Sequence, residues 1–170
     1  LMTVGRLDLD SEGLLLMTND GDLARHLELP STGWSRKYRV RAQGQISESQ
    51  LAALADGVTI DGIRYGQVIA KLDRQMASNA WLTVAIREGK NREIRRIMEY
   101  LGHKVSRLIR ISYGPFQLGD LEDGAIEQVK ARVLADQLGL GDGTLEASEK
   151  PTLSINKPAH KSGAKRGRHA

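Results

Sequence analysis

Short runs of strand-like residues, separated by helix signals, are the feature that most limits how this chain can fold. Lys37, Arg39 and Arg41 alternate with aromatic or apolar residues, which is the pattern of a half-buried strand. The run Leu14 to Met17 is apolar on both faces, as a strand inside a sheet would be. Both runs are far shorter than the roughly 20 apolar residues that a membrane-spanning helix needs. The sequence therefore predicts strands of a folded sheet and no membrane span.

The remaining patterns place more strands and helices along the chain. We expect strands near residues 14–17, 36–42, 63–72, 80–87 and 105–112, and helices over residues 19–29, 47–57, 91–101 and 124–138. Ser47 followed by Gln50 has the spacing of a capping box, and Asn91 suits the cap of the next helix. Because the strands mostly follow one another in hairpins with helices inserted between them, the predicted class is α+β, with a central mixed, largely antiparallel sheet and flanking helices.

Length and composition exclude several classes of protein. With 170 residues and a mass of 18.7 kDa, the chain can bury a core as one domain. It contains no cysteine, which excludes a disulfide framework, a thiolate zinc site and a cysteine nucleophile, and we therefore expect a cytoplasmic protein. The four histidines lack the spacing that places two imidazoles on one helical face, so we expect no metal site.

The positive charge is unevenly distributed along the chain. Residues 1–149 hold all 21 acidic residues and 19 of the 25 basic ones, whereas the six basic residues from Lys150 onward have no acidic neighbours. We therefore predict a folded domain over residues 1–140 and a disordered basic tail over residues 141–170. Residues 87–110 hold eight basic residues against three acidic ones, and residues 36–41 form a second basic cluster. Such clusters on a nearly neutral body indicate a polyanionic partner.

Two segments carry groups that can do chemistry. Between Gly5 and Leu16, three carboxylates and one arginine crowd a turn ahead of the buried strand, where they either react or simply solvate the turn. The second segment, residues 88–98, has one apolar helical stripe, with Arg92 and Arg96 pointing to solvent. Arg95 lies at the border of that stripe, where it either pairs with a carboxylate or covers the edge of the core.

Two further features suit RNA. Tyr38 lies among basic residues on its strand, where it either stacks on an exposed base or belongs to the core. Lys90 and Asn91 stand at the expected helix start, where backbone N–H groups can receive a phosphate.

Three strings occur in these segments in a characteristic order. They are Gly-Arg-Leu-Asp at 5–8 with Leu-Leu-Leu-Met-Thr-Asn-Asp-Gly at 14–21, Lys-Tyr-Arg-Val at 37–40, and Glu-Gly-Lys-Asn-Arg-Glu-Ile-Arg-Arg at 88–96. Together they resemble the ribosomal-RNA pseudouridine synthases of the RsuA/RluB family, over roughly residues 1 to 138. The resemblance implies conversion of uridine to pseudouridine in ribosomal RNA, without cofactor or metal. The form Leu-Asp-Leu-Asp-Ser-Glu favours large-subunit ribosomal RNA.

The resemblance also assigns roles to four residues. Asp8 matches the family's catalytic aspartate, whose ionised oxygen can attack either C1′ of the sugar or C6 of the base. Arg95 matches the arginine that pairs with this aspartate and keeps it ionised. Tyr38 matches the tyrosine that stacks on the flipped uracil and is a candidate for removing the C5 proton. Arg6 matches a position that fills the space left by the extruded base.

The expected partner is ribosomal RNA. We expect six residues to contact it: Arg6, Lys37, Lys90, Asn91, Arg92 and Arg96. Family members usually carry an S4-type RNA-binding domain ahead of the first string, so we expect this chain to begin inside a larger, monomeric protein. Two alternatives stay open: an RNA-binding ribosome-assembly factor without catalysis, and a polyanion-binding module unrelated to RNA. A pure binder would not need Asp8, Tyr38 and Arg95 together.

Overall fold

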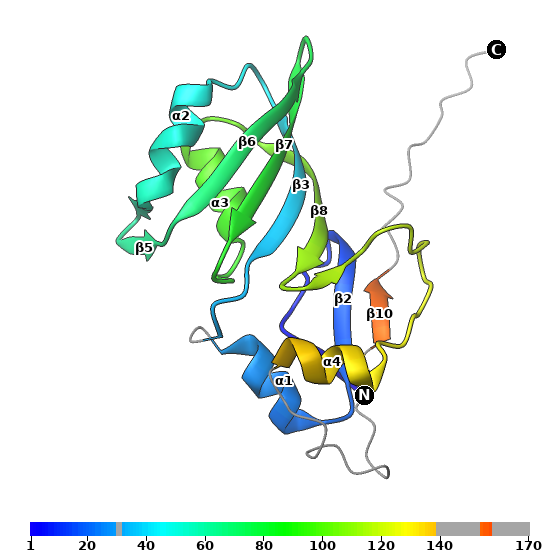
Figure 1. The fold of residues 1–170 in the computed structure, drawn as a ribbon. Helices are drawn as coiled ribbons and strands as arrows, with labels where there is room; N and C mark the ends of the chain where they lie inside the picture. The colour runs from blue at the N-terminus through cyan, green and yellow to red at the C-terminus, as the bar shows by residue number, and fades with distance from the viewer. Residues whose placement is uncertain (30–31, 139–153, 158–170) are drawn as a thin grey trace, which may run out of the picture.

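An eight-stranded mixed sheet forms the centre of the molecule (Figure 1). The computed structural model describes residues 1–29, 32–138 and 154–157. The strands of this sheet are β1 (Met2–Val4), β2 (Glu12–Thr18), β3 (Arg36–Gln43), β6 (Val68–Gln75), β7 (Asn79–Ile86), β8 (Val105–Tyr113), β9 (Phe116–Gln117) and β10 (Ser154–Lys157). Their order is β1-β2-β8-β3-β7-β6, with β10 also beside β2 and β9 also beside β8.

The other elements lie around this sheet. The helices are α1 (Gly21–Glu28), α2 (Glu48–Ala53), the 3-10 turn η2 (Leu54–Asp56), α3 (Glu93–Tyr100) and α4 (Ala131–Leu138). Strands β4 (Val58–Ile60) and β5 (Ile63–Tyr65) form a separate hairpin. None of the described helices is long and apolar enough to cross a membrane.

Antiparallel pairing dominates the sheet, with β2 and β8 as its parallel pair. That parallel contact is short, because only Glu12 and Gly13 of β2 are in register with Ile109 and Arg110 of β8. The predicted α+β class with a mixed, largely antiparallel sheet is confirmed. Strand β8 is paired with β3 along most of its length, so it links the two parts of the sheet.

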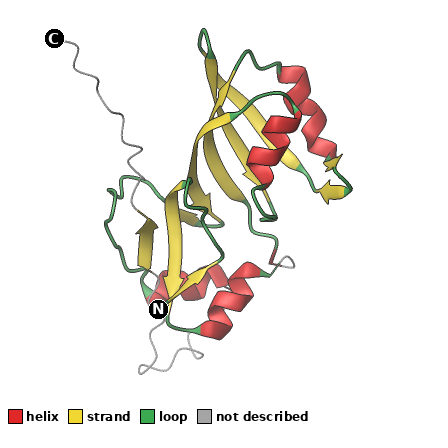
Figure 2. Cartoon of the chain, turned by 180° about the vertical axis from the view of Figure 1, so that it is seen from behind, coloured by secondary structure: helices red, strands yellow, loops and turns green. Residues whose placement is uncertain are grey.

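Two hydrophobic cores lie on either side of the β2–β8 junction. The larger core fills the space between one face of β3, β6, β7 and β8 and the helices α2 and α3, which Figure 2 shows in front of the sheet. The smaller core packs Leu14 and Leu16 of β2 against Leu27 of α1 and Leu134 of α4. The alternation in β3 explains its part in the larger core, because Val40 and Ala42 point to the same face and are both fully buried.

Several predicted elements differ from the structure in detail. The strand expected over residues 63–72 is split into β5 and β6, and the last helix begins at Ala131 rather than near residue 124. The predicted capping box is wrong: Ser47 precedes α2 but makes no capping bond, and its Oγ lies 2.6 Å from Ser49 Oγ instead.

The predicted disordered tail needs one correction. Residues 154–157, inside the predicted tail, form β10 beside β2. The strand edge of β2 supplies unpaired backbone groups, which any extended segment can satisfy regardless of its charge. The rest of the predicted tail lies outside the described residues, so its predicted disorder stays a prediction.

Gly13 provides a direct test of the β2–β8 junction. Its φ is +104°, and a Cβ there would lie 2.3 Å from the carbonyl oxygen of Arg110. We expect Gly13→Ala to lower the free energy of unfolding by about 2 kcal/mol or more, because it combines backbone strain with a backbone clash. Gly62→Ala is the matched control, since Gly62 has φ +77° but open space around it. Equal losses for the two variants in urea unfolding would show that the junction is not tightly packed.

Candidate active site

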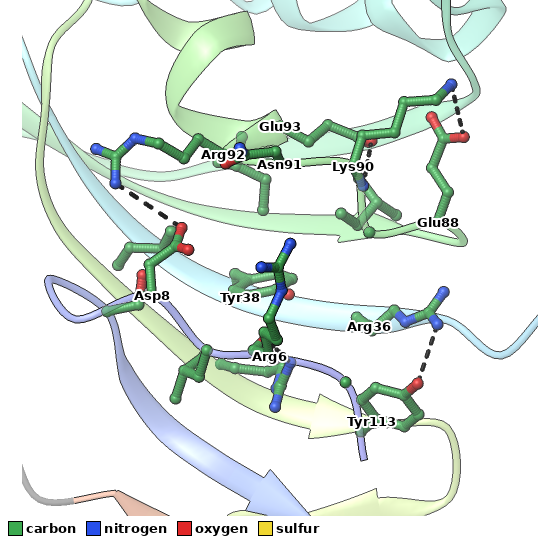
Figure 3. A pocket seen from close by; sticks show the side chains of 18 of the residues that line it. Arg6, Asp8, Arg36, Tyr38, Glu88, Lys90, Asn91, Arg92, Glu93 and Tyr113 are labelled. Atoms are coloured by element: carbon green, nitrogen blue, oxygen red, sulfur yellow. Dashed lines mark hydrogen bonds and ion pairs between the residues drawn. The ribbon is translucent and has the colours of Figure 1, made fainter. Parts of the chain in front are cut away.

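A cavity of about 650 Å³ opens between the two cores. Figure 3 shows Arg6 and Asp8 on one side of it, residues 88–93 on the opposite side, and Tyr38 and Arg36 on the strand between them. The cavity thus collects side chains from the β1–β2 loop, from β3, from β8 and from the start of α3. Its size is in the range of pockets that enclose a small ligand or a single nucleotide.

The loop that carries Asp8, residues 5–11, is held by hydrogen bonds at both ends. The Gly5 N–H donates to Glu28 Oε1 at 2.6 Å, at the C-terminal end of α1. The Ser11 N–H donates to the Asp8 carbonyl oxygen at 3.0 Å, closing a turn, and Ser11 itself is buried. A side chain on a turn fixed in this way loses little conformational entropy when it meets a ligand.

Arg110 of β8 ties the same loop to the sheet from below. Its Nε donates to the Leu14 carbonyl oxygen at 2.8 Å, and its Nη1 lies 3.4 Å from the Arg6 carbonyl oxygen. The side chain is buried, and its Nη2 has no hydrogen-bond partner among the described residues. A buried guanidinium that donates to backbone carbonyls is costly to replace, so Arg110 acts as a positioning residue for the loop.

Two aspartates and two arginines form an ionic cluster at one end of the cavity. Arg92 donates to both carboxylate oxygens of Asp10, at 3.1 and 3.0 Å, and its Nη1 lies 3.9 Å from Asp8 Oδ2. Arg95 Nη2 donates to the Asp10 carbonyl oxygen at 2.8 Å, and its Nε lies 3.5 Å from Asp10 Oδ2. The hydrogen bond from Arg92 lowers the pKa of Asp10 below its usual value. Asp8 keeps 39% of its side chain exposed and lines the cavity.

The position of Arg92 follows from the start of α3. The helix is capped by Arg92, not by Asn91 as predicted, and Arg92 has a left-handed backbone with φ 51°. Arg92 is exposed, as the wheel predicts, and from this position its side chain reaches Asp10 and Asp8. Arg95 is buried at the edge of the apolar stripe, as the wheel predicts.

A pair of carboxyl groups lies on the α3 side of the cavity. Glu88 accepts from the Gly66 N–H at 2.7 Å and pairs with Lys90 at 3.2 Å. Although burial opposes it, these contacts lower the pKa of Glu88. Burial raises the pKa of Glu93 to about 8, and the nearby negative charge of Glu88 adds to the rise. At neutral pH, Glu93 therefore holds a proton while Glu88 is ionised.

Aromatic and cationic groups line the rest of the cavity. Tyr38 is half-buried on β3 and borders the same space as Asp8. Arg36 donates to the Arg87 carbonyl oxygen at 2.7 Å and to the Tyr113 hydroxyl at 3.0 Å. The guanidinium carbons of Arg36 and Arg110 lie 4.8 and 5.3 Å from the centre of the Tyr113 ring. Cationic side chains at this position suit a ligand that carries phosphate.

The predicted site residues are only partly brought together. The cavity is lined by Arg6, Asp8, Tyr38, Lys90, Asn91 and Arg92. Outside its lining lie Arg95, which is buried behind the Asp8 loop, and the exposed Lys37 and Arg96. The pairing of Arg95 with Asp8 stays a prediction, since the contacts just described join Arg95 to Asp10.

Sequence reasoning missed several groups in the site. They are Asp10, Arg36, Glu93, Arg110 and Tyr113. One signal for Arg110 was available, because it falls two residues after Leu108 on the inward side of its strand. A charged residue at an inward position has to find polar partners, and these are usually functional or structural.

Comparison with known proteins agrees with this geometry. A sequence model of the family described as RNA pseudouridylate synthase matches residues 1–100. The chain belongs to this family. The resemblance inferred from the three sequence strings is thereby confirmed.

Relatives within the family share much of the chain. An uncharacterized RNA pseudouridine synthase of Rickettsia felis is 51% identical over 134 residues, which are 79% of this chain and 58% of that protein. Ribosomal large subunit pseudouridine synthase B of Haemophilus influenzae is 46% identical over 118 residues, 69% of this chain and 33% of that protein. The chain thus spans little more than half of the Rickettsia protein.

A solved structure supports the fold independently. The crystal structure of a pseudouridylate synthase superposes with a TM-score of 0.68 at 28% identity. The match covers 82% of this chain and 59% of that one. The chain therefore shares with this family both the sequence strings and the arrangement of the sheet and helices.

The raised pKa of Glu93 predicts a pH dependence of stability. The folded state keeps the Glu93 proton up to about pH 8, whereas the unfolded state loses it near its ordinary value of 4.5. Since the folded state binds more protons between these values, its stability falls as the pH rises through this window. We expect Glu93→Gln to unfold at the same temperature as the parent near pH 4, and at a higher temperature at pH 8.5.

The exposed Glu99, on the same helix, provides the control. Glu99→Gln should not reproduce the pH-dependent gain in melting temperature. A gain for Glu93→Gln that is the same at pH 4 and pH 8.5 would contradict the assignment of a protonated Glu93.

Proposed function

We propose that this chain converts uridine to pseudouridine in RNA, with Asp8 as the nucleophile. One observation carries the proposal: Asp8 borders a cavity of nucleotide size, with Tyr38 and a cationic wall around it. Its carboxylate is partly exposed, and its Oδ2 lies 3.9 Å from Arg92 Nη1. An ionised oxygen facing a cavity is what attack on C1′ or C6 requires.

The reaction exchanges one bond of the nucleoside for another. The N1–C1′ bond breaks, a C5–C1′ bond forms, and the proton on C5 is removed while N1 gains one. We assign Tyr38 to stack on the uracil, because it is the aromatic side chain of β3 that faces the Asp8 loop across the cavity. The tyrosine hydroxyl is also our candidate for taking the C5 proton.

The substrate we propose is ribosomal RNA, more specifically that of the large subunit. The relative in Haemophilus influenzae is named for that subunit, which supports the assignment. A uridine has to leave its stack to enter the cavity, as in other base-modifying enzymes. Arg6 lines the cavity, and we assign it to fill the space that the base leaves.

The remaining predicted residues act on the RNA or on Asp8. We propose that Lys90, Asn91 and Arg92 hold phosphates next to the flipped nucleotide, since all three line the cavity. Arg95 positions the Asp8 loop through its bond to the Asp10 carbonyl. The exposed side chains of Lys37 and Arg96 contact RNA outside the cavity.

The chain's ends and its compartment belong to the same proposal. Residues 1–140 act as the catalytic domain, and the six basic residues from Lys150 onward add sequence-independent affinity for RNA. The absence of cysteine is consistent with work in the reducing cytoplasm.

Asp8→Asn tests the proposed nucleophile. An amide has no anionic oxygen, so release of tritium from ribosomal RNA labelled at uridine C5 should fall at least about 10³-fold. Binding of the RNA should change little, because the proposed phosphate contacts are made by Lys90, Asn91 and Arg92 and not by Asp8. Asp22→Asn serves as the matched control, because it makes the same change at an exposed carboxylate of α1. Release by the Asp8 variant at the parent rate would leave a non-catalytic RNA binder as the better description.

Arg95 and Arg96 are neighbours with different surroundings. Arg95 is buried against the Asp8 loop, whereas Arg96 is exposed. Arg95→Met should lower the turnover number by about 100-fold, because the loop loses a charged hydrogen bond that orients Asp8. Arg96→Met should instead raise the Kd for RNA. The melting temperatures of both variants distinguish lost positioning from unfolding, and equal turnover numbers at saturating RNA would refute the difference in roles.

A further inference from the structure

The face of the sheet opposite α2 and α3 carries no helix in the described structure (Figures 1 and 2). Side chains alternate between the two faces along each strand. Val40 and Leu82 point into the larger core, so their neighbours Arg39, Arg41 and Trp81 point to the other face. This face lies across the sheet from Tyr38 and the cavity.

Strand register defines which residues meet there. One row joins Arg74 of β6, Trp81 of β7 and Arg41 of β3, and the next joins Lys71, Thr83 and Arg39. Lys37 lies two residues before Arg39 on the same side of β3. We call this set the Trp81 face: Lys37, Arg39, Arg41, Lys71, Arg74, Trp81 and Thr83.

Trp81 is the centre of this surface. The guanidinium carbons of Arg39 and Arg41 lie 5.0 and 5.7 Å from the centre of its ring. Arg41 is further oriented by its Nε, which donates to Ser106 Oγ at 2.9 Å. A guanidinium group stacked on an aromatic ring can still donate its edge N–H groups to phosphate oxygens. Its outer planar face can still stack on a base.

The charge of the Trp81 face is strongly positive. Five of its side chains are cationic, and Asp73, which accepts from Thr83 Oγ1 at 2.6 Å, is an acidic group lying among them. Beyond Arg41, toward β8, the charge changes, because Arg107 is paired with Glu12 at 2.7 Å. The excess of cations is therefore concentrated on β3, β7 and β6.

We propose that the Trp81 face binds RNA at a second site, separate from the catalytic cavity. Phosphates contact the five cationic side chains, and an unstacked base lies against the layer formed by Arg39 and Trp81. Sheet surfaces that combine aromatic and basic side chains suit single-stranded RNA in this way. The inference rests on the proposed function for the identity of the polyanion, since a chain that modifies RNA has RNA as its available partner. A large folded substrate can reach both faces of so small a domain.

The test compares two double variants of equal charge. Arg39→Gln with Arg41→Gln removes two cations from the Trp81 face. Arg25→Gln with Arg132→Gln removes two exposed arginines from α1 and α4 and serves as the control. The probe is an unmodified transcript of large-subunit ribosomal RNA, and its Kd is measured at several salt concentrations.

We expect the Trp81-face variant to bind at least 5-fold more weakly than the control variant. Its slope of log K against log salt should be shallower by about 1.4 to 1.8, because each phosphate contact contributes about 0.7 to 0.9. Unchanged affinity and slope would overturn the inference. So would binding of phosphatidylserine vesicles, but not of the transcript, through the same two arginines.

Tryptophan fluorescence supplies a second readout, which needs no substitution on the Trp81 face. The chain has two tryptophans, Trp34 and Trp81, so Trp34→Phe leaves Trp81 as the sole emitter. The transcript should quench its emission, and emission that stays constant at saturating RNA would contradict contact with the face. Neither measurement requires turnover. If the parent protein releases no tritium but the transcript still quenches Trp81, the proposed function alone is refuted. If the parent protein releases tritium but the transcript does not quench Trp81, this inference alone is refuted.

Discussion

The short parallel contact between β2 and β8 is the constraint on which the rest of the structure depends. Only two residue pairs make it, yet it joins the part of the sheet that carries the Asp8 loop to the part that packs on α2 and α3. Gly13 allows the two backbones to approach, and Arg110 ties Leu14 and Arg6 to β8 at the same point. The relative position of the loop and the cavity wall is set there.

This arrangement explains why so many charged groups can lie close together. Asp8 and Asp10 face Arg92 and Arg95 across the cavity edge, so each carboxylate has a cation within ion-pair distance or a hydrogen bond from one. On the opposite wall, Glu93 avoids the cost of a second buried negative charge by holding a proton. The ion pairs of Asp8 and Asp10 and the proton on Glu93 therefore reduce the negative charge around the cavity.

The sequence predicted the larger features well, because they depend on local patterns. Alternation identified β3, and the apolar stripe of α3 placed Arg95 at the buried border. The three strings identified the family, which the family model that matches residues 1–100 confirms. The helical wheel placed Arg92 in solvent, where it is exposed, but the wheel contains no information on its contacts with Asp10 and Asp8, which come from a distant loop.

Other features depended on contacts between distant segments, which no local pattern contains. The role of Arg110 arises from carbonyl groups of β2 and the Asp8 loop, about 100 residues earlier in the chain. Arg39 and Arg41 were linked to Tyr38 in sequence, but the sheet turns them to the other face, where their aromatic partner is Trp81. Pairing of β3 with β7 decides this, and the pairing is a property of the whole fold.

The central claim is that Asp8 isomerises uridine in ribosomal RNA. Mapping pseudouridines at single-nucleotide resolution tests it most directly, in cells that lack the gene and in the same cells carrying either the parent gene or its Asp8→Asn form. We predict that one or a few sites disappear on deletion, return with the parent gene and stay absent with the Asp8→Asn gene. An unchanged map after deletion, or full restoration by the Asp8→Asn gene, would contradict the account.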